Sequence, residues 1–145
     1  MKLSNLAFSK SGFCCAFIFL LMPCTLLAEV VDISINELQT MIESKQAVVI
    51  DVRTPREWQQ TGIVEGSIPI MFFDEKRRPH AQEWLNQAAA HLTSEQELIL
   101  ICRSGNRSKI IANYLVRQHG YTRVYNVKAG IQQWLRLGHK TVEPN

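Results

Sequence analysis

The sequence has little excess charge and no region that would divide it into separate parts. Its 145 residues include 16 lysines and arginines against 13 aspartates and glutamates, a formal net charge of +3. Lys2 and Lys10 precede a strongly apolar segment, and the remainder of the chain is almost balanced. No linker or internal repeat interrupts that remainder. The sequence therefore predicts one domain and gives no ground for binding to nucleic acid or to a membrane surface.

Acidic residues are absent from the first 28 positions. Lys2 and Lys10 lie in its first ten residues, an apolar run covers residues 12–22, and small or apolar residues continue to Ala28. This layout is typical of a secretory signal peptide that is cut after Ala28. The alternative is an uncleaved anchor, because residues 11–28 are uncharged and about the minimum length for a bilayer span. We expect export to a periplasm or a similar compartment, with an outward-facing membrane-anchored form as the alternative.

Cysteine is scarce once residues 1–28 are set aside. Cys14, Cys15 and Cys24 lie within that segment, so Cys102 is the one cysteine of the mature chain and an internal disulfide is excluded. A single thiol in an exported protein is a liability unless it is buried or used. Cys102 is therefore either a small buried residue at the end of a strand or a reactive thiol, and the residues around it favour the reactive thiol.

The histidines form no pattern that would pair them with one another or with Cys102. They stand at His80, His91, His119 and His139. Metal sites built from cysteine and histidine need closely spaced ligands, so we expect no metal and no other cofactor. A reactive Cys102 would also have to act without a histidine base.

What the chain does contain is an alternation of short apolar strands and amphipathic helices. Strands are expected over residues 30–33, 47–52, part of 62–70, 98–101 and 123–127, and helices over 35–42, from 55 onward, over 81–92, from 109 to 120 and over 131–135. Short apolar strands separated by helices are typical of parallel sheets. The sequence predicts an α/β fold with a central, mostly parallel five-stranded sheet and helices on both faces, in a single domain of residues 29–145.

Two helix starts carry clear signals. Ser34 with Glu37 forms a capping-box pattern, and Thr54 is followed by Pro55 at the first helical position. A polar and charged stretch at residues 74–79 is expected to be a connection or a lid.

Two polar segments follow predicted strands directly. Asp51-Val52-Arg53 ends one apolar strand, and Cys102 ends another. Ligand sites of parallel sheets lie at the carboxyl ends of the strands, so both segments are expected at the edge that carries the site.

The loop after Cys102 has the composition of an anion cradle. It consists of Arg103, Ser104, Gly105, Asn106, Arg107 and Ser108. Successive backbone N–H groups, the start of a helix and two arginines would all favour a thiolate, and loops of this kind lower the pKa of a free cysteine from about 8.5 to between about 3.5 and 7.5. Gly105 permits a tight turn, and the Ser108 hydroxyl is available as a hydrogen-bond donor. The same cradle would hold an oxyanion or a persulfide.

The charged residues near this loop have structural interpretations as well. One of Arg103 and Arg107 is expected to bind substrate, whereas the other points to solvent or pairs with an acid. Arg107, nearer the helix, is the candidate for a clamp on the loop. Asp51, Arg53 and Glu57 are interpreted as a supporting ion-pair network beside the site.

Four segments of the mature chain together resemble the rhodanese family of sulfurtransferases. The segments are Asp51-Val52-Arg53 with Glu57, the glycine-marked stretch 62–67, the loop 102–108, and residues 125–130 with Trp134. They are similar to the family's "DVR…E", "GHIPGA", active-site loop and closing "GG…W" elements. The resemblance implies that Cys102 takes the outer sulfur of a donor such as thiosulfate, releases sulfite, and passes the sulfur from its persulfide to cyanide or a thiol.

Two other classes remain open at this stage. Cysteine phosphatases use a similar cradle, but they place five residues between cysteine and arginine, whereas Cys102 and Arg107 enclose four. The other alternative is a non-catalytic sulfur carrier or sensor. The expected partners are a small anionic sulfur donor and a thiol or cyanide acceptor, the thiol belonging to a protein in one version, and the domain is expected to be a monomer.

Overall fold

The computed structural model describes residues 28–45, 47–92 and 96–144. The predicted signal peptide or anchor, apart from Ala28, lies outside these residues. Within them, no helix is both long enough and apolar enough to cross a membrane.

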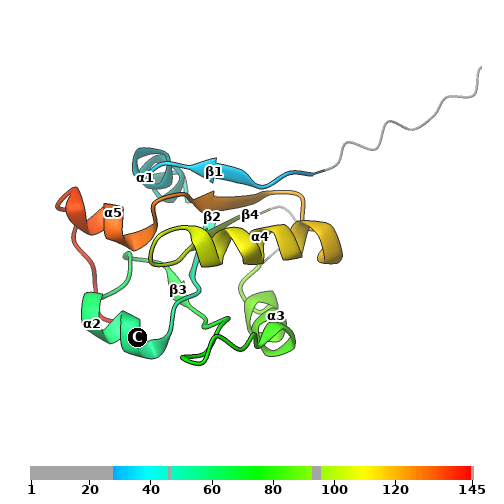
Figure 1. The fold of residues 1–145 in the computed structure, drawn as a ribbon. Coiled ribbons are helices and arrows are strands. Elements are labelled where there is room, and N and C mark those ends of the chain that lie inside the picture. Colours follow the sequence, from blue (N-terminus) through cyan, green and yellow to red (C-terminus); the bar gives the residue numbers. More distant parts are fainter. Residues whose placement is uncertain (1–27, 46, 93–95, 145) are drawn as a thin grey trace, which may run out of the picture.

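A five-stranded parallel sheet forms the centre of the described residues (Figure 1). Its strands are β1 (Val31–Ile33), β2 (Ala47–Asp51), β3 (Ile68–Pro69), β4 (Glu97–Ile101) and β5 (Val124–Val127). They lie in the order β1-β5-β4-β2-β3, and every neighbouring pair is parallel. The helices are α1 (Ile35–Glu43), α2 (Pro55–Thr61), α3 (Ala81–Ala89), α4 (Asn106–His119) and α5 (Gly130–Arg136). The predicted fold class is confirmed.

Strand β4 is buried on both of its faces. Leu98 and Leu100 pack in one core cluster with residues of α3 and α4, whereas Ile99 and Ile101 pack in a second cluster with residues of α1 and α5. All four side chains are at most 1% exposed. This alternation places α3 and α4 on one side of the sheet and α1 and α5 on the other, as Figure 1 shows.

Both predicted helix caps are present. The Ser34 side chain accepts the Glu37 N–H and Glu37 accepts the Ser34 N–H, which completes a capping box on α1. Thr54 and Glu57 make the same reciprocal contacts on α2, with Pro55 in its first turn. These local contacts satisfy N–H groups that a helix start otherwise leaves without partners.

Three elements differ from those expected by more than one residue at an end. Helix α4 begins at Asn106 rather than near Lys109, because Gly105 ends the loop in a left-handed conformation and its carbonyl already accepts the Lys109 N–H. Helix α3 ends at Ala89 rather than Leu92, since Ala90 and His91 donate to carbonyls in a tighter turn. The expected strand within 62–70 is confined to Ile68–Pro69.

The polypeptide leaves the neighbouring strands β2 and β4 toward opposite edges of the sheet. Strand β2 continues through α2 to β3 on one side of the sheet, and β4 continues through α4 to β5 on the other. This reversal creates a crevice beyond the strand ends, the usual ligand position in parallel α/β sheets. Asp51 ends β2 and Cys102 follows β4, so both lie at this point.

Candidate active site

Cys102 lies directly after β4 and is enclosed by the loop that follows it. Its side chain is only 1% exposed, and its Sγ accepts the backbone N–H of Gly105 at 3.1 Å. Gly105 has φ +87°, and a Cβ at that position would overlap the carbonyl oxygen of Lys128. Only glycine fits this conformation and space. Of the backbone N–H groups expected around the sulfur, the structure shows that of Gly105 in contact with it.

The first turn of α5 contacts the other side of the loop. Ile131 N–H donates to the Cys102 carbonyl at 2.9 Å, and Gln132 N–H donates to the Arg103 carbonyl at 3.1 Å. A Cβ on Gly130, at φ +59°, would overlap the Cys102 carbonyl oxygen. The loop position thus depends on β5 and α5 as well as on β4.

Arg107 is paired with Glu57 of α2. Its Nη1 lies 2.9 Å from Glu57 Oε2, and its Nη2 lies 2.5 Å from Oε1. Burial raises the pKa of Glu57, but hydrogen bonds from Arg107 and from the Thr54 backbone outweigh that effect and the pKa is about 2. The hydrogen bonds with Glu57 raise the pKa of Arg107 in turn. Both groups are therefore charged near neutral pH, and the pair fastens the start of α4 to α2.

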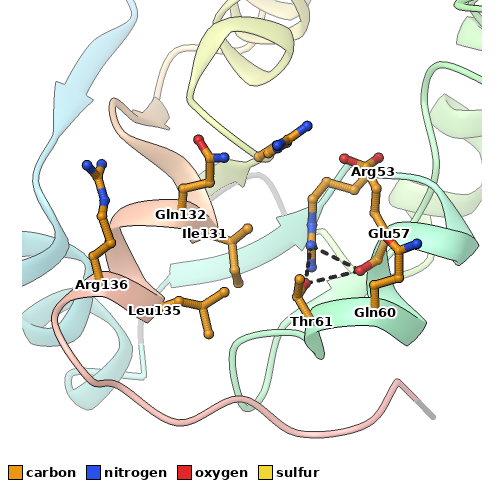
Figure 2. A pocket seen from close by; sticks show the side chains of 9 residues that line it. Arg53, Glu57, Gln60, Thr61, Ile131, Gln132, Leu135 and Arg136 are labelled. Atoms are coloured by element: carbon orange, nitrogen blue, oxygen red, sulfur yellow. Dashed lines mark hydrogen bonds between the residues drawn. The ribbon is translucent and has the colours of Figure 1, made fainter.

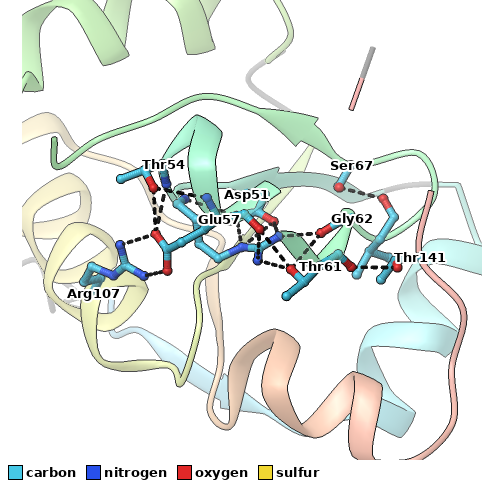
Figure 3. A network of polar contacts seen from close by, with 10 residues as sticks. Asp51, Thr54, Glu57, Thr61, Gly62, Ser67, Arg107 and Thr141 are labelled. Atoms are coloured by element: carbon cyan, nitrogen blue, oxygen red, sulfur yellow. Dashed lines mark hydrogen bonds and ion pairs between the residues drawn. The ribbon is translucent and has the colours of Figure 1, made fainter. Parts of the chain in front are cut away.

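Arg53 forms a buried ion pair with Asp51, and Figure 3 shows Asp51 with Thr61 and Gly62 in the surrounding polar network. Arg53 is 1% exposed and its Nη2 lies 2.7 Å from Asp51 Oδ2. Arg53 Nη2 also donates to the Gly62 carbonyl at 2.7 Å, and Arg53 Nη1 donates to Thr61 Oγ1 at 2.7 Å. Of the ion-pair network expected for Asp51, Arg53 and Glu57, the Asp51–Arg53 pair is present, whereas the Glu57 carboxylate pairs with Arg107. Arg53 reaches only the Glu57 backbone carbonyl, because the Glu57 carboxylate is directed to Arg107.

Arg103, in contrast, is exposed and lies where two recesses meet. One recess, of about 520 Å³, lies between α2 and α5 and is shown in Figure 2 with Gln60, Gln132 and Arg136 among its lining residues. The other, of about 730 Å³, has Arg56 and Arg77 among its lining residues. Arg103 lines both, and it has no ion-pair partner among the described residues. Ser104 and Asn106 are also exposed on the larger recess.

Ser108 faces the sulfur from the first turn of α4. Its Oγ lies 3.3 Å from Cys102 Sγ and 2.6 Å from Asn126 Oδ1 on β5. Asn126 Nδ2 in turn donates to Asp32 Oδ1 at 2.8 Å. Asp32 and Asn126 were not among the predicted site residues. The signal that brings them together is the parallel register of β1 and β5, which pairs these two residues directly.

Three of the four histidines contact side chains away from Cys102. His80 lies near Asp74, His119 packs on Tyr114, and His139 packs on Trp134. In the part of the chain that the structure describes, no three side chains of histidine, cysteine, aspartate or glutamate gather as they would around a metal ion.

The fold and the loop together define a class: an α/β domain that places a cysteine at the switch point of its sheet, with its sulfur held by the amide of Gly105. The model of the rhodanese-like domain family matches residues 34–137. The chain belongs to that family.

Named relatives agree with this assignment. A sulfurtransferase of Allochromatium vinosum is 31% identical over 106 residues, which cover 73% of this chain and 88% of the relative. Thiosulfate sulfurtransferase 18 of Arabidopsis thaliana is 32% identical over 111 residues, 74% of this chain and 79% of the relative. The crystal structure of a rhodanese-related protein from Thermoplasma volcanium is similar with a TM-score of 0.59 at 27% identity, covering 77% of this chain and 97% of that protein. The relatives therefore support sulfur transfer as the general chemistry of the family.

Proposed function

We propose that this protein is a sulfurtransferase that moves a sulfane sulfur from thiosulfate, through a persulfide on Cys102, to cyanide or a thiol. The observation that carries the proposal is the enclosed Cys102, whose Sγ accepts the Gly105 N–H at 3.1 Å. Its family membership and the names of its relatives support the same chemistry.

The reaction divides into two displacements at sulfur. The Cys102 thiolate attacks the outer sulfur of thiosulfate, a bond forms between the two sulfurs, and the bond to the sulfonate sulfur breaks so that sulfite leaves with its electron pair. The acceptor, cyanide or a thiolate, then attacks the outer sulfur of the persulfide. The Cys102 thiolate leaves and is ready for the next turnover.

The two arginines of the loop have different roles in this proposal. Arg107 is a clamp, because Glu57 occupies both of its terminal nitrogens. Arg103 is exposed and unpaired within the described residues, and it supplies the positive charge for the thiosulfate dianion and the departing sulfite. Ser104, Asn106 and the backbone amides complete the binding surface for the donor.

A phosphatase is the less favoured alternative. A cradle with four residues between Cys102 and Arg107 is one residue shorter than the phosphatase loop, and the arginine at its end is already committed to Glu57. The shorter cradle suits a single sulfur better than a tetrahedral phosphate.

Thiocyanate formation from thiosulfate and cyanide tests the proposal. We expect the mature domain to produce thiocyanate and the Cys102→Ser variant to produce none, with unchanged thermal unfolding as the control for folding. Equal activity in the variant would refute the mechanism. Turnover of an aryl phosphate without thiocyanate would support the phosphatase instead, and a stable persulfide without turnover would support a sulfur carrier.

A further inference from the structure

A chain of polar side chains runs from the catalytic sulfur to the surface. Ser108 is completely buried and Asn126 is 2% exposed, whereas Asp32 at the outer end is exposed. The contacts are 3.3 Å from Cys102 Sγ to Ser108 Oγ, 2.6 Å from Ser108 Oγ to Asn126 Oδ1 and 2.8 Å from Asn126 Nδ2 to Asp32 Oδ1. The sequence places Ser108 in the predicted cradle, and no pattern in it assigns a role to Asn126 or Asp32.

The surface carboxylate determines the direction of every hydrogen bond in this chain. Hydrogen bonds from Asn126 and Lys109 hold the pKa of Asp32 below its usual range, so it is ionised near neutral pH. A carboxylate only accepts, and Asn126 must therefore turn its NH₂ group toward Asp32. Its carbonyl Oδ1 then faces Ser108, and since that oxygen also only accepts, the Ser108 hydroxyl is the donor.

Ser108 has one hydroxyl proton and three acceptors within reach. These are Asn126 Oδ1 at 2.6 Å, the Gly105 carbonyl at 3.2 Å and Cys102 Sγ at 3.3 Å. The shortest contact takes the proton. We propose that Asn126 is a positioning residue that directs the Ser108 proton away from Cys102, so that Ser108 faces the sulfur as an acceptor.

This direction has a consequence for the reaction, and here the inference rests on the proposed sulfur transfer. An acceptor suits the S–H of a resting thiol, and it is compatible with the inner sulfur of a persulfide, because the negative charge of a persulfide lies on the outer sulfur. It does not suit the bare thiolate, which gains the Ser108 proton only if the hydroxyl turns away from Asn126. The hydrogen bonds from Ser108 through Asn126 to Asp32 thus favour the cysteine persulfide over the free thiolate.

Charged groups also surround this sulfur, and the test must separate their effect from that of the chain. Arg107 of α4 interacts electrostatically with both Cys102 and Asp51, while Lys109 and Lys128 face Asp32. Arg103 adjoins Cys102 in the loop and is exposed. A neutral substitution of Asn126 leaves all of these charges in place.

The pH profile of Cys102 alkylation by iodoacetamide is the direct test. In Asn126→Leu the remaining acceptors of the Ser108 proton are the Gly105 carbonyl at 3.2 Å and the sulfur at 3.3 Å, and the charged thiolate is the stronger of the two. We therefore expect the midpoint of the profile to move down by about one pH unit, the effect of one hydrogen bond to a charged group. A midpoint that is unchanged or raised in the folded variant would overturn the proposal. A merely structural role of Asn126 would change rates at all pH values without this downward shift.

A surface substitution gives a second test in case Asn126→Leu fails to fold. In Asp32→Ala the Asn126 amide is free to turn, its NH₂ group then donates to Ser108, and the midpoint should again fall. Removing the Asp32 charge would lower it as well, so the same substitution is also made in a Ser108→Ala background. We expect a smaller shift there, because only the effect of the lost charge is left; a shift of equal size in both backgrounds would show a charge effect alone and would refute the role of the Ser108–Asn126–Asp32 hydrogen bonds.

Alkylation requires no sulfur donor, so this test is independent of the proposed activity. If the wild type forms no thiocyanate but the midpoints shift as expected, the sulfurtransferase proposal fails and the positioning role of Asn126 stands. If thiocyanate forms but the midpoints do not shift, the sulfurtransferase proposal stands and the positioning role of Asn126 is refuted. Where both hold, Asn126→Leu should also lower the fraction of persulfide at a fixed ratio of thiosulfate to sulfite.

Discussion

At the scale of single residues, Glu57 contributes to both folding and the site. It caps α2 through Thr54 and pairs with Arg107 of α4, fifty residues away in the sequence. The same carboxylate therefore makes a local contact and a long-range contact. The helix cap is recognisable in the sequence, whereas the pairing with Arg107 is not. This contact holds Arg107, the arginine that the sequence offered as the candidate for a clamp on the loop.

The Glu57–Arg107 pair should make the folded protein sensitive to acid. The pKa of Glu57 is about 2 in the folded protein against an ordinary value of 4.5, so its contribution to stability is complete above about pH 4.5 and is lost as the pH falls toward 2. Because the two side chains are 29% and 23% exposed, we expect about 1–3 kcal/mol. Urea unfolding across this range should show a loss in the wild type that is smaller in Glu57→Gln.

Glu65→Gln, at an exposed position, is the matched control for that series. It should retain the acid sensitivity of the wild type. Equal acid sensitivity in wild type and Glu57→Gln would contradict the stabilising role of the pair.

Gly105 should be irreplaceable for a reason other than its backbone angle alone. Gly105→Ala adds a Cβ against the Lys128 carbonyl, so we expect a loss of about 1–3 kcal/mol in unfolding free energy and a fall of about 100-fold in thiocyanate formation. Gly66 is the matched control, since its φ is +77° and nothing lies within 4 Å of an added Cβ. Gly66→Ala should cost about 1 kcal/mol and leave the reaction unchanged. Equal activity losses in the two variants would contradict the account of the loop.

At the scale of elements, the site depends on β4 being buried from both sides. Ile99→Ala and Leu100→Ala remove side chains from opposite faces of the strand, and each should lower the unfolding free energy by about 2–5 kcal/mol. Ile110 on α4 is 60% exposed, and Ile110→Ala should change stability by no more than about 0.5 kcal/mol. Denaturant titration measures all three. A small effect at either strand position would show that one face is not packed as described.

Elements with strong local signals could be predicted from the sequence, and long-range polar partners could not. The apolar run before Cys102 and the capping residues Ser34 and Thr54 identified the strand and two helices because their causes are local. The partners of Arg107 and Ser108 come from α2 and β5, and only the strand order brings those elements to the loop. A pattern of spacing contains no information about which acid an arginine will reach.

At the scale of the whole molecule, the described domain belongs to the rhodanese-like family, and the N-terminal segment remains a prediction about location. If residues 1–28 are a signal peptide, a bacterium that expresses the full chain should contain in its periplasm a protein whose intact mass corresponds to residues 29–145. Full-length protein in the membrane fraction would indicate the anchor instead. Full-length protein in the cytoplasm would contradict both.

The family assignment, the fold and the position of Cys102 at the switch point all lead to one central claim, that the sulfur of Cys102 carries the transferred atom. Intact-protein mass spectrometry after addition of thiosulfate, with the released sulfite counted, tests it most directly. The account predicts a gain of one sulfur atom per chain, one sulfite released for each sulfur gained, and neither change in Cys102→Ser. No mass gain in the wild type, or an equal gain in Cys102→Ser, would contradict it.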